Sequence, residues 1–193
     1  MDVEARHAAW VALSSGRVVA LLGAESTGKT ALARDLSQRL ADRHGLRCTW
    51  VSEWLREWCE REGRSPQREE QAAIAAEQTR RIAAACKDHD IVLADTTALM
   101  TAVYSRFLFN DDSLMVQAQS TQRDYAVTLV TANDLPWIPD PNQRDGVHVR
   151  EPVHDLLMQA LRVARIESDP VQGLGSERLD HALAHVRRRL NLY

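Results

Sequence analysis

The chain has 193 residues, of which 45% are hydrophobic and 26% are charged, a composition typical of one soluble globular domain with a substantial core. The formal net charge of -3 gives no general attraction to nucleic acid or to an anionic membrane, so we expect neither as a partner. The three cysteines lack the spacing of a zinc site or a disulfide framework, and no apolar run approaches the roughly 20 residues of a membrane span. The N-terminus has no signal-peptide pattern, and we therefore expect a cytoplasmic protein.

Short apolar strands alternate with amphipathic helices along the sequence. The predicted strands cover residues 18–22, 46–51, 91–94 and 127–130. The predicted helices cover residues 4–13, 29–44 and 67–88, with two more around residues 152–161 and 179–190. This alternation predicts one α/β domain over residues 1–193, in which residues 1–16 form an N-terminal extension ahead of a parallel sheet. Ligands of such sheets bind beyond the carboxyl ends of the strands.

The sequence GAESTGKT follows the first predicted strand and satisfies the pattern G-x-x-x-x-G-K-[ST] of a phosphate-binding loop. Gly23 and Gly28 permit backbone conformations in which successive N–H groups point at phosphate oxygens, helped by the N-terminus of the next helix. We expect the nucleotide to contact Gly23, Ala24, Glu25, Ser26, Thr27, Gly28, Lys29, Thr30 and Ala31. The order of strand, loop and helix predicts a P-loop NTPase with a three-layer sandwich; the alternative is a chance glycine-rich turn. No Asn-Lys-x-Asp motif follows, so ATP is the expected nucleotide.

Other side chains have the chemistry that a bound triphosphate needs. Lys29 should reach the outer phosphates and act in catalysis, and the Thr30 hydroxyl should ligate Mg²⁺. Asp95 follows a buried strand, so we expect it to orient Mg²⁺ or to accept the proton of an attacking hydroxyl. The alternative is that Asp95 caps the helix that follows it. His181 and His185 have metal-binding spacing but no third ligand, so we expect solvated helix histidines.

Two further stretches carry residues suited to substrate binding. Glu53, Trp54 and Arg56 follow the second strand, and tryptophans beside charged groups suit a pocket for a flat, partly polar ligand. The alternative is an amphipathic turn whose tryptophans pack into the core. Residues 133–151 are rich in proline and aspartate and include Arg144 and Arg150. This pattern predicts a lid whose arginines neutralise charge on the transferring phosphoryl group. The alternative there is an ordinary exposed loop, which proline and aspartate favour equally.

Together these stretches resemble one family, the ribosylnicotinamide kinase domain of the bacterial multifunctional NAD regulator and its stand-alone P-loop relatives. The shared motifs are GAESTGKT, Glu53-Trp54-Leu55-Arg56-Glu57, Ile74-Ala75-x-x-Gln78, Asp95-Thr96 followed by Thr101, and Asp134-x-Pro136-Trp137-x-x-Asp140-x-x-x-Arg144. They occur in this order over about residues 17–190, nearly the whole chain.

The resemblance implies a nucleoside-kinase-like fold with a lid. It also implies that ATP phosphorylates the 5′-hydroxyl of nicotinamide riboside and gives nicotinamide mononucleotide. In family terms Glu53 and Asp95 approach the acceptor sugar, and Arg144 and Arg150 serve as lid arginines. Trp137 would stack on the nicotinamide ring, where a pyridinium over an indole gains cation–π attraction.

Two positions depart from the family pattern. Thr97 stands where family members commonly carry an acidic or amide residue, and Pro141 stands where a glycine is common. The competing hypotheses are a kinase of another nucleoside or metabolite, and a P-loop ATPase or regulatory protein that couples hydrolysis to a partner protein. The regulator would need a glutamate beside Asp95 to polarise water, whereas Thr96 stands there. The oligomeric state, homo-oligomers included, is left open.

Overall fold

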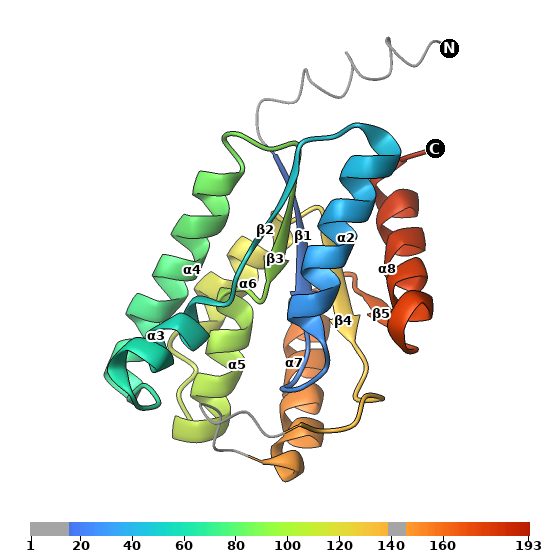
Figure 1. Cartoon of the computed structure of the whole chain (residues 1–193). Helices are drawn as coiled ribbons and strands as arrows, with labels where there is room; N and C mark the ends of the chain where they lie inside the picture. The colour runs from blue at the N-terminus through green and yellow to red at the C-terminus, as the bar shows by residue number, and fades with distance from the viewer. Residues whose placement is uncertain (1–15, 139–145) are drawn as a thin grey trace.

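A five-stranded parallel sheet forms the centre of the protein in the computed structural model, which describes residues 16–138 and 146–193 (Figure 1). The strands lie in the order β2-β3-β1-β4-β5. Their bounds are β1 Arg17–Leu22, β2 Cys48–Val51, β3 Ile91–Asp95, β4 Val127–Thr131 and β5 Asp169–Val171. All four pairings are parallel, which confirms the predicted α/β class. The predicted helix over residues 4–13 lies outside the described residues.

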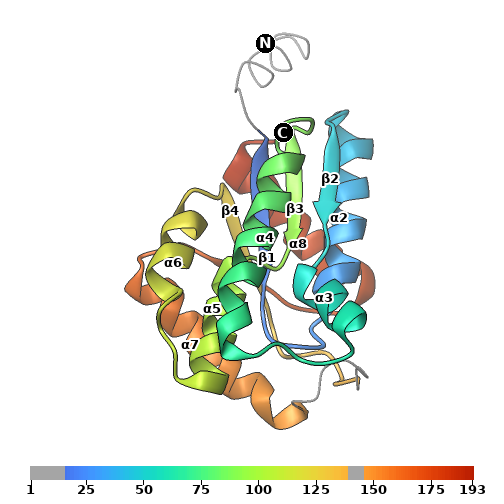
Figure 2. The same cartoon turned by 90° about the vertical axis from the view of Figure 1, so that its left-hand side faces the viewer.

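Helices cover both faces of the sheet and complete the predicted three-layer sandwich (Figures 1 and 2). Their bounds are α2 Lys29–His44, α3 Trp54–Glu62, α4 Gln71–Ala85, α5 Ala98–Phe109, α6 Met115–Arg123, α7 Arg150–Val163 and α8 Gly175–Leu190, with 3₁₀ turns η1 Arg68–Glu70 and η2 Val147–Val149. Helices α2 and α8 pack on one face, and α4, α5, α6 and α7 pack on the other. Helix α3 packs against α4 through a separate small cluster.

The central strand β1 supplies both halves of the core. Val19 and Leu21 pack among residues of α2 and α8, whereas Ala20 and Leu22 pack among residues of α5 and α7. All four side chains are fully buried. Burial on both faces explains why β1 is a continuous apolar run and shows no polar alternation.

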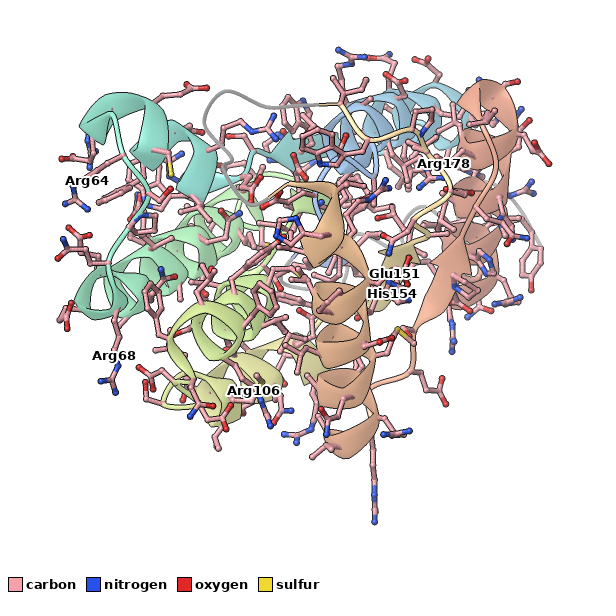
Figure 3. The ribbon with its side chains drawn as sticks, turned by 90° about the horizontal axis from the view of Figure 1, so that it is seen from below. Arg64, Arg68, Arg106, Glu151, His154 and Arg178 are labelled. Carbon is pink, nitrogen blue, oxygen red and sulfur yellow. The ribbon has the colours of Figure 1, made fainter. Side chains whose placement is uncertain are left out.

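The strand register brings the functional segments to one edge of the sheet. Leu21 of β1 pairs with Asp95 at the end of β3, and Leu22 pairs with Val130 near the end of β4. The loop that begins at Gly23 therefore lies beside the carboxyl ends of both neighbouring strands. This edge is the lower one in Figure 1, and Figure 3 shows it from below.

Some elements differ from their predicted extents. Strand β2 begins at Cys48 and not at residue 46, and the helix predicted over residues 67–88 consists of η1 followed by α4. The sequence pattern did not predict α3, α6 or β5, and it indicated α5 only as a helix that follows Asp95. Within the two described ranges, no helix is both long enough and apolar enough to cross a lipid bilayer.

Candidate functional site

The predicted phosphate loop connects β1 to α2 in a conformation that requires its glycines. Gly23 has a φ of 144°, and a Cβ atom there would lie 2.2 Å from Thr131 Oγ1. Gly28 has a φ of 76° and forms the N-cap of α2. Because neither position accepts a side chain, the backbone is free to approach a ligand closely. The loop thus precedes the N-terminus of a 16-residue helix, which is a site suited to anions.

Buried hydroxyls hold the inner side of this loop against the sheet. Thr27 is fully buried, and its Oγ1 donates to the carbonyl of Ala24 at 2.9 Å. The same oxygen lies 2.7 Å from Thr131 Oγ1, which donates to the carbonyl of Leu22 at 3.1 Å. The Thr27 side chain therefore holds the loop in shape, and the backbone N–H groups of the loop are the groups predicted to contact phosphate.

Arg178, near the start of α8, holds the phosphate loop through hydrogen bonds, and no motif in the sequence predicted it. Its side chain is 5% exposed. One terminal nitrogen donates to the carbonyl of Thr27 at 2.9 Å, and the other donates to Asp134 Oδ1 at 2.7 Å and to the carbonyl of Gly173 at 2.9 Å. We call Arg178 with Asp134, Gly173 and Thr27 the Arg178 clamp; Figure 3 shows where Arg178 lies.

The clamp also fixes the charge of its carboxylate. Partial burial opposes ionisation of Asp134, but hydrogen bonds from Arg178 and from the backbone N–H of Gly173 outweigh burial and lower the pKa of Asp134. The carboxylate therefore ties the segment after β4 to α8. No sequence spacing signals this pairing, because the two residues belong to distant segments that only the fold brings together.

Thr30 and Asp95 meet at the end of the loop. The Thr30 hydroxyl donates to Asp95 Oδ2 at 2.5 Å, and Asp95 is 1% exposed. The other oxygen, Asp95 Oδ1, is buried without a hydrogen-bond partner in the part of the chain that the structure describes. Helix α5 is capped by the Thr97 side chain, which accepts from the N–H of Leu99. Capping is thus not the role of Asp95, and the alternative raised from the sequence is wrong.

The donor set at this corner fits Mg²⁺. A hydroxyl and a carboxylate are hard oxygen ligands, and Mg²⁺ takes few protein ligands because it keeps waters and binds phosphate oxygens. Among the described residues, no group of three or more histidine, cysteine or acidic side chains forms a metal cage. Lys29 lies beside the same loop, with its ammonium donating to the carbonyl of Ala24 at 2.7 Å.

The two histidines of α8 take part in a separate polar cluster at the β5 edge of the sheet. His181 Nε2 and His185 Nε2 lie 3.2 Å apart, and His185 Nδ1 lies 3.4 Å from Asp169 Oδ1. Burial lowers the pKa of His185 despite this carboxylate. The expectation of solvated side chains is therefore wrong for His185, whose side chain is only 12% exposed.

A cleft of about 750 Å³, partly open to solvent, runs from the phosphate loop between α3 and α5. Its polar and charged lining residues are Glu25, Lys29, Glu53, Arg56, Ser65, Gln71 and Thr96. Its remaining lining residues are Gly23, Leu55, Cys59, Pro66, Met100, Tyr104 and Leu108. A concave cleft with a few polar groups among apolar side chains is the usual form of a small-molecule site.

A buried glutamine positions the cleft wall at the start of α3. Gln78 is 1% exposed; its Oε1 accepts from the N–H of Trp54 at 2.7 Å, and its Nε2 donates to the carbonyl of Ser52 at 3.2 Å. These bonds hold Glu53, the N-cap of α3, at the edge of the cleft. Arg56 lines the same wall, 3.9 Å from Glu53.

The tryptophans expected in this pocket are not among the residues that line it. Trp58 is buried against Ile74, and the guanidinium carbon of Arg81 lies 4.0 Å from the centre of the Trp54 ring. Trp137 is half-buried in the segment after β4 and does not line the cleft either. Its neighbour Ile138 approaches the phosphate loop, with its N–H donating to Ser26 Oγ at 2.9 Å.

Of the two predicted lid arginines, the structure describes only Arg150. Arg144 lies outside the described residues. Arg150 begins α7 and is 6% exposed, with one terminal nitrogen donating to the carbonyl of Leu135 at 3.0 Å. Its Nε and Nη2 atoms have no hydrogen-bond partner among the described residues. Arg150 is therefore a buried cation beside the segment after β4 and not part of an exposed loop.

Comparisons with known proteins agree with this fold. Residues 18–178 match the AAA_28 family, described as an AAA domain. A NadR protein in complex with NR superimposes with a TM-score of 0.75 at 20% identity, covering 92% of this chain and 52% of that chain. A NadR protein in complex with NAD and AMP-PNP gives 0.74 at 21% identity, covering 92% and 50%. Thymidylate kinase from Ehrlichia chaffeensis gives 0.60 at 14% identity, covering 91% and 99%.

The chain spans about half the length of the two NadR chains. None of the curated proteins matches the sequence significantly. At such low identity the solved structures show the fold alone, which is the parallel α/β sandwich with a phosphate loop that the sequence predicted. Because the family match covers most of the sequence, the chain belongs to the AAA_28 family of AAA domains.

Proposed function

We propose that the protein is a kinase that uses ATP and Mg²⁺ to phosphorylate a hydroxyl group of a small molecule. The observation that carries this proposal is a shared cleft: Lys29 of the phosphate loop and Glu53 at the start of α3 line the same cavity. Phosphoryl transfer needs mainly the positioning of donor and acceptor and the neutralisation of charge. A cleft that begins at the phosphate loop and continues between two helices offers both sites in one cavity.

Each residue has a role that follows from its position. Lys29 and the loop N–H groups would hold the phosphates of ATP. Thr30 and Asp95 would hold Mg²⁺, which when bound neutralises charge on the phosphate oxygens. Glu53 would accept a hydrogen bond from the acceptor hydroxyl, because it lines the cleft whereas Asp95 is engaged by Thr30.

The buried Arg150 would supply positive charge beside the segment after β4. Its guanidinium binds the carbonyl of Leu135, a residue whose side chain lies beside Gly28 of the loop. Its Nε and Nη2 atoms lack partners among the described residues, but both are fully buried and Arg150 does not line the cleft. The predicted catalytic role of Arg150 therefore requires that ligand binding exposes these donors to anionic oxygens.

Nicotinamide riboside is the acceptor that we propose. Two observations support it: the ordered motifs of the sequence, and the similarity of the fold to a NadR protein in complex with NR. The cleft offers a carboxylate for a sugar hydroxyl and an apolar wall for a ring. Trp54 and Trp137 are not part of this proposal, since neither lines the cleft.

A product assay tests the proposal. The protein is incubated with Mg-ATP and a panel of nucleosides, and ADP release is followed together with the mass of the product. We expect nicotinamide riboside to accelerate ADP release and to gain one phosphate. ADP release indifferent to every acceptor would instead support an ATPase or regulatory protein, and this kinase proposal would be abandoned.

Asp95→Asn serves as the site variant, and Asp180→Asn, an exposed carboxylate on α8, is its matched control. We expect Asp95→Asn to lower product formation at least about 100-fold, because it removes a charge that holds the metal. The same variant should abolish the Mg²⁺-dependent tightening of ATP-analogue binding, and the control should change neither quantity.

A further inference from the structure

Gln71 is a largely buried polar side chain in the wall of the cleft, and its carboxamide has no hydrogen-bond partner among the described residues. It is the first residue of α4, is 3% exposed and lines the cleft between α3 and α5. Among the described residues none donates to its carboxamide oxygen or accepts from its carboxamide nitrogen. Its polar atoms are not among the fully buried atoms that lack a partner, so they reach the open space of the cleft, where water or a ligand can bind them.

The other buried glutamine on the same face of α4 shows what a structural role requires. Gln78, two turns along the helix, uses its oxygen and its nitrogen to bind the backbone of Trp54 and Ser52. Gln71 has the same side chain and similar burial, but its polar atoms are offered to the cleft. The difference points to a ligand as the missing partner of Gln71.

The segment that carries Gln71 is held rigidly from outside the cleft. Arg64 binds Glu70 through two hydrogen bonds of 2.7 Å, and Glu70 also accepts from the N–H of Gln67 at 2.8 Å. Arg68 binds Asp111 at 2.8 Å. Figure 3 shows Arg64 and Arg68 at the outer margin of the molecule. These contacts hold the backbone that leads into α4, so Gln71 starts from a defined position in the cleft wall.

The surroundings of Gln71 define the chemistry of the ligand group. Leu55, Pro66, Met100 and Leu108 line the cleft as apolar side chains, which suits the faces of a flat ring. A carboxamide presents one acceptor and one donor side by side, and a group that satisfies both also carries a donor next to an acceptor, as another amide does.

We propose that Gln71 recognises the amide edge of the acceptor's ring through a paired donor and acceptor contact. This inference rests on the proposed function, because it places the acceptor in this cleft. The amide can be an exocyclic carboxamide, as in nicotinamide riboside, or the ring amide of a pyrimidine nucleoside. A ring that carries a carboxylate in its place lacks the donor and is rejected.

The test measures the affinity of nicotinamide riboside, nicotinic acid riboside, uridine and thymidine by calorimetry, together with their phosphorylation rates. Wild type should bind an amide-bearing nucleoside at least about tenfold more tightly than nicotinic acid riboside, and the identity of that nucleoside distinguishes the two amide sources. Gln71→Leu and Gln71→Glu should each weaken its binding at least about tenfold, with ATP-analogue affinity unchanged. Gln117→Leu, the same change at an exposed position of α6, should have no effect.

Three outcomes overturn the proposal and are distinguishable. Equal acceptor affinity in wild type and in both variants would refute the role of Gln71 while the kinase proposal stands. Loss of ATP-analogue binding in both variants would instead assign Gln71 a structural role. Failure of the wild type to phosphorylate any acceptor would remove the kinase proposal and this inference together.

Discussion

Replacing Arg178 with methionine should cost both stability and nucleotide affinity. The change removes a buried guanidinium whose terminal nitrogens donate to Asp134 Oδ1 and to the carbonyls of Thr27 and Gly173. Asp134 then keeps the hydrogen bond from the N–H of Gly173 but loses the one from the guanidinium. Breaking a buried ion pair by deleting one partner costs about 3–5 kcal/mol. The Asp134 side chain is 34% exposed and can be hydrated, so we expect a loss near the lower limit.

The expected loss of about 3 kcal/mol corresponds to a fall in Tm of about 6–12 °C for a domain of this size. Thermal unfolding measures the fall, and calorimetry with an ATP analogue measures affinity at a temperature where both proteins are folded. Affinity should fall as well, because the released Thr27 carbonyl belongs to the phosphate loop. Arg178→Lys keeps one charge but cannot reach both Asp134 and Thr27, so it should recover part of the stability and little of the affinity.

A matched surface pair supplies the control. Arg39 and Asp180 join α2 to α8 at 3.6 Å with side chains 35% and 62% exposed, so Arg39→Met should cost no more than about 1 kcal/mol. If Arg178→Met changes Tm and nucleotide affinity no more than Arg39→Met does, the Arg178 clamp does not support the loop.

Two further changes test the loop and the β5 edge. Gly23→Ala should destabilise the protein and abolish ATP-analogue binding, because its Cβ would lie 2.2 Å from Thr131 Oγ1. Gly45→Ala is the control: its Cβ meets no atom within 4 Å, so it should lower the free energy of unfolding by about 1–2 kcal/mol and leave binding unchanged. Asp169 is buried, which opposes its ionisation, but Arg189, His185 and Arg188 together lower its pKa. Its stabilisation is therefore present above the unfolded pKa of about 3.9 and is lost as the pH falls through the folded pKa. The difference in free energy of unfolding between wild type and Asp169→Asn, from denaturant titrations, should therefore shrink between pH 6 and pH 3; a constant difference would contradict this account.

The elements predicted correctly are those whose burial follows a simple apolar period. In α2 the predicted face of Leu32, Leu36 and Leu40 is buried, and its helix ends at Gly45, which adopts the left-handed conformation. Helix α6 lacks such a signal because its buried face includes Gln119 and Gln122, which bury polar atoms in hydrogen bonds that only the fold provides. The buried face of α6 could therefore not be predicted from the polarity of its residues.

Strand β5 was missed for a related reason. It has three residues, Asp169, Pro170 and Val171, and only the valine is apolar. Its position at the sheet edge depends on pairing with β4, and its aspartate is held by Arg188 and Arg189 of α8. These contacts come from a distant helix, and a local sequence window contains none of them.

Within the candidate site, local geometry was predictable and distant contacts were not. The loop glycines and the Thr30–Asp95 meeting follow from a motif and from two adjacent strands. Trp54 and Trp58 were expected in a pocket, although their spacing of four residues places them on one face of α3, and that face packs on α4. The helical spacing of Trp54 and Trp58 therefore predicts that they pack on a neighbouring helix, whereas their aromatic character alone suggested a ligand pocket.

The departure at Thr97 has a structural explanation that bears on the acceptor. The Thr97 hydroxyl donates to Gln122 Oε1 at 2.7 Å and caps α5, and its side chain is almost fully buried. An acidic or amide residue at this position could contact a ligand, whereas Thr97 bonds to Gln122 inside the protein. Thr96 and Glu53 line the cleft and Thr97 does not. If the proposed kinase function holds, the contacts to an acceptor hydroxyl therefore come from the end of β3 and the start of α3, and Glu53 is the carboxylate that we propose for acceptor positioning.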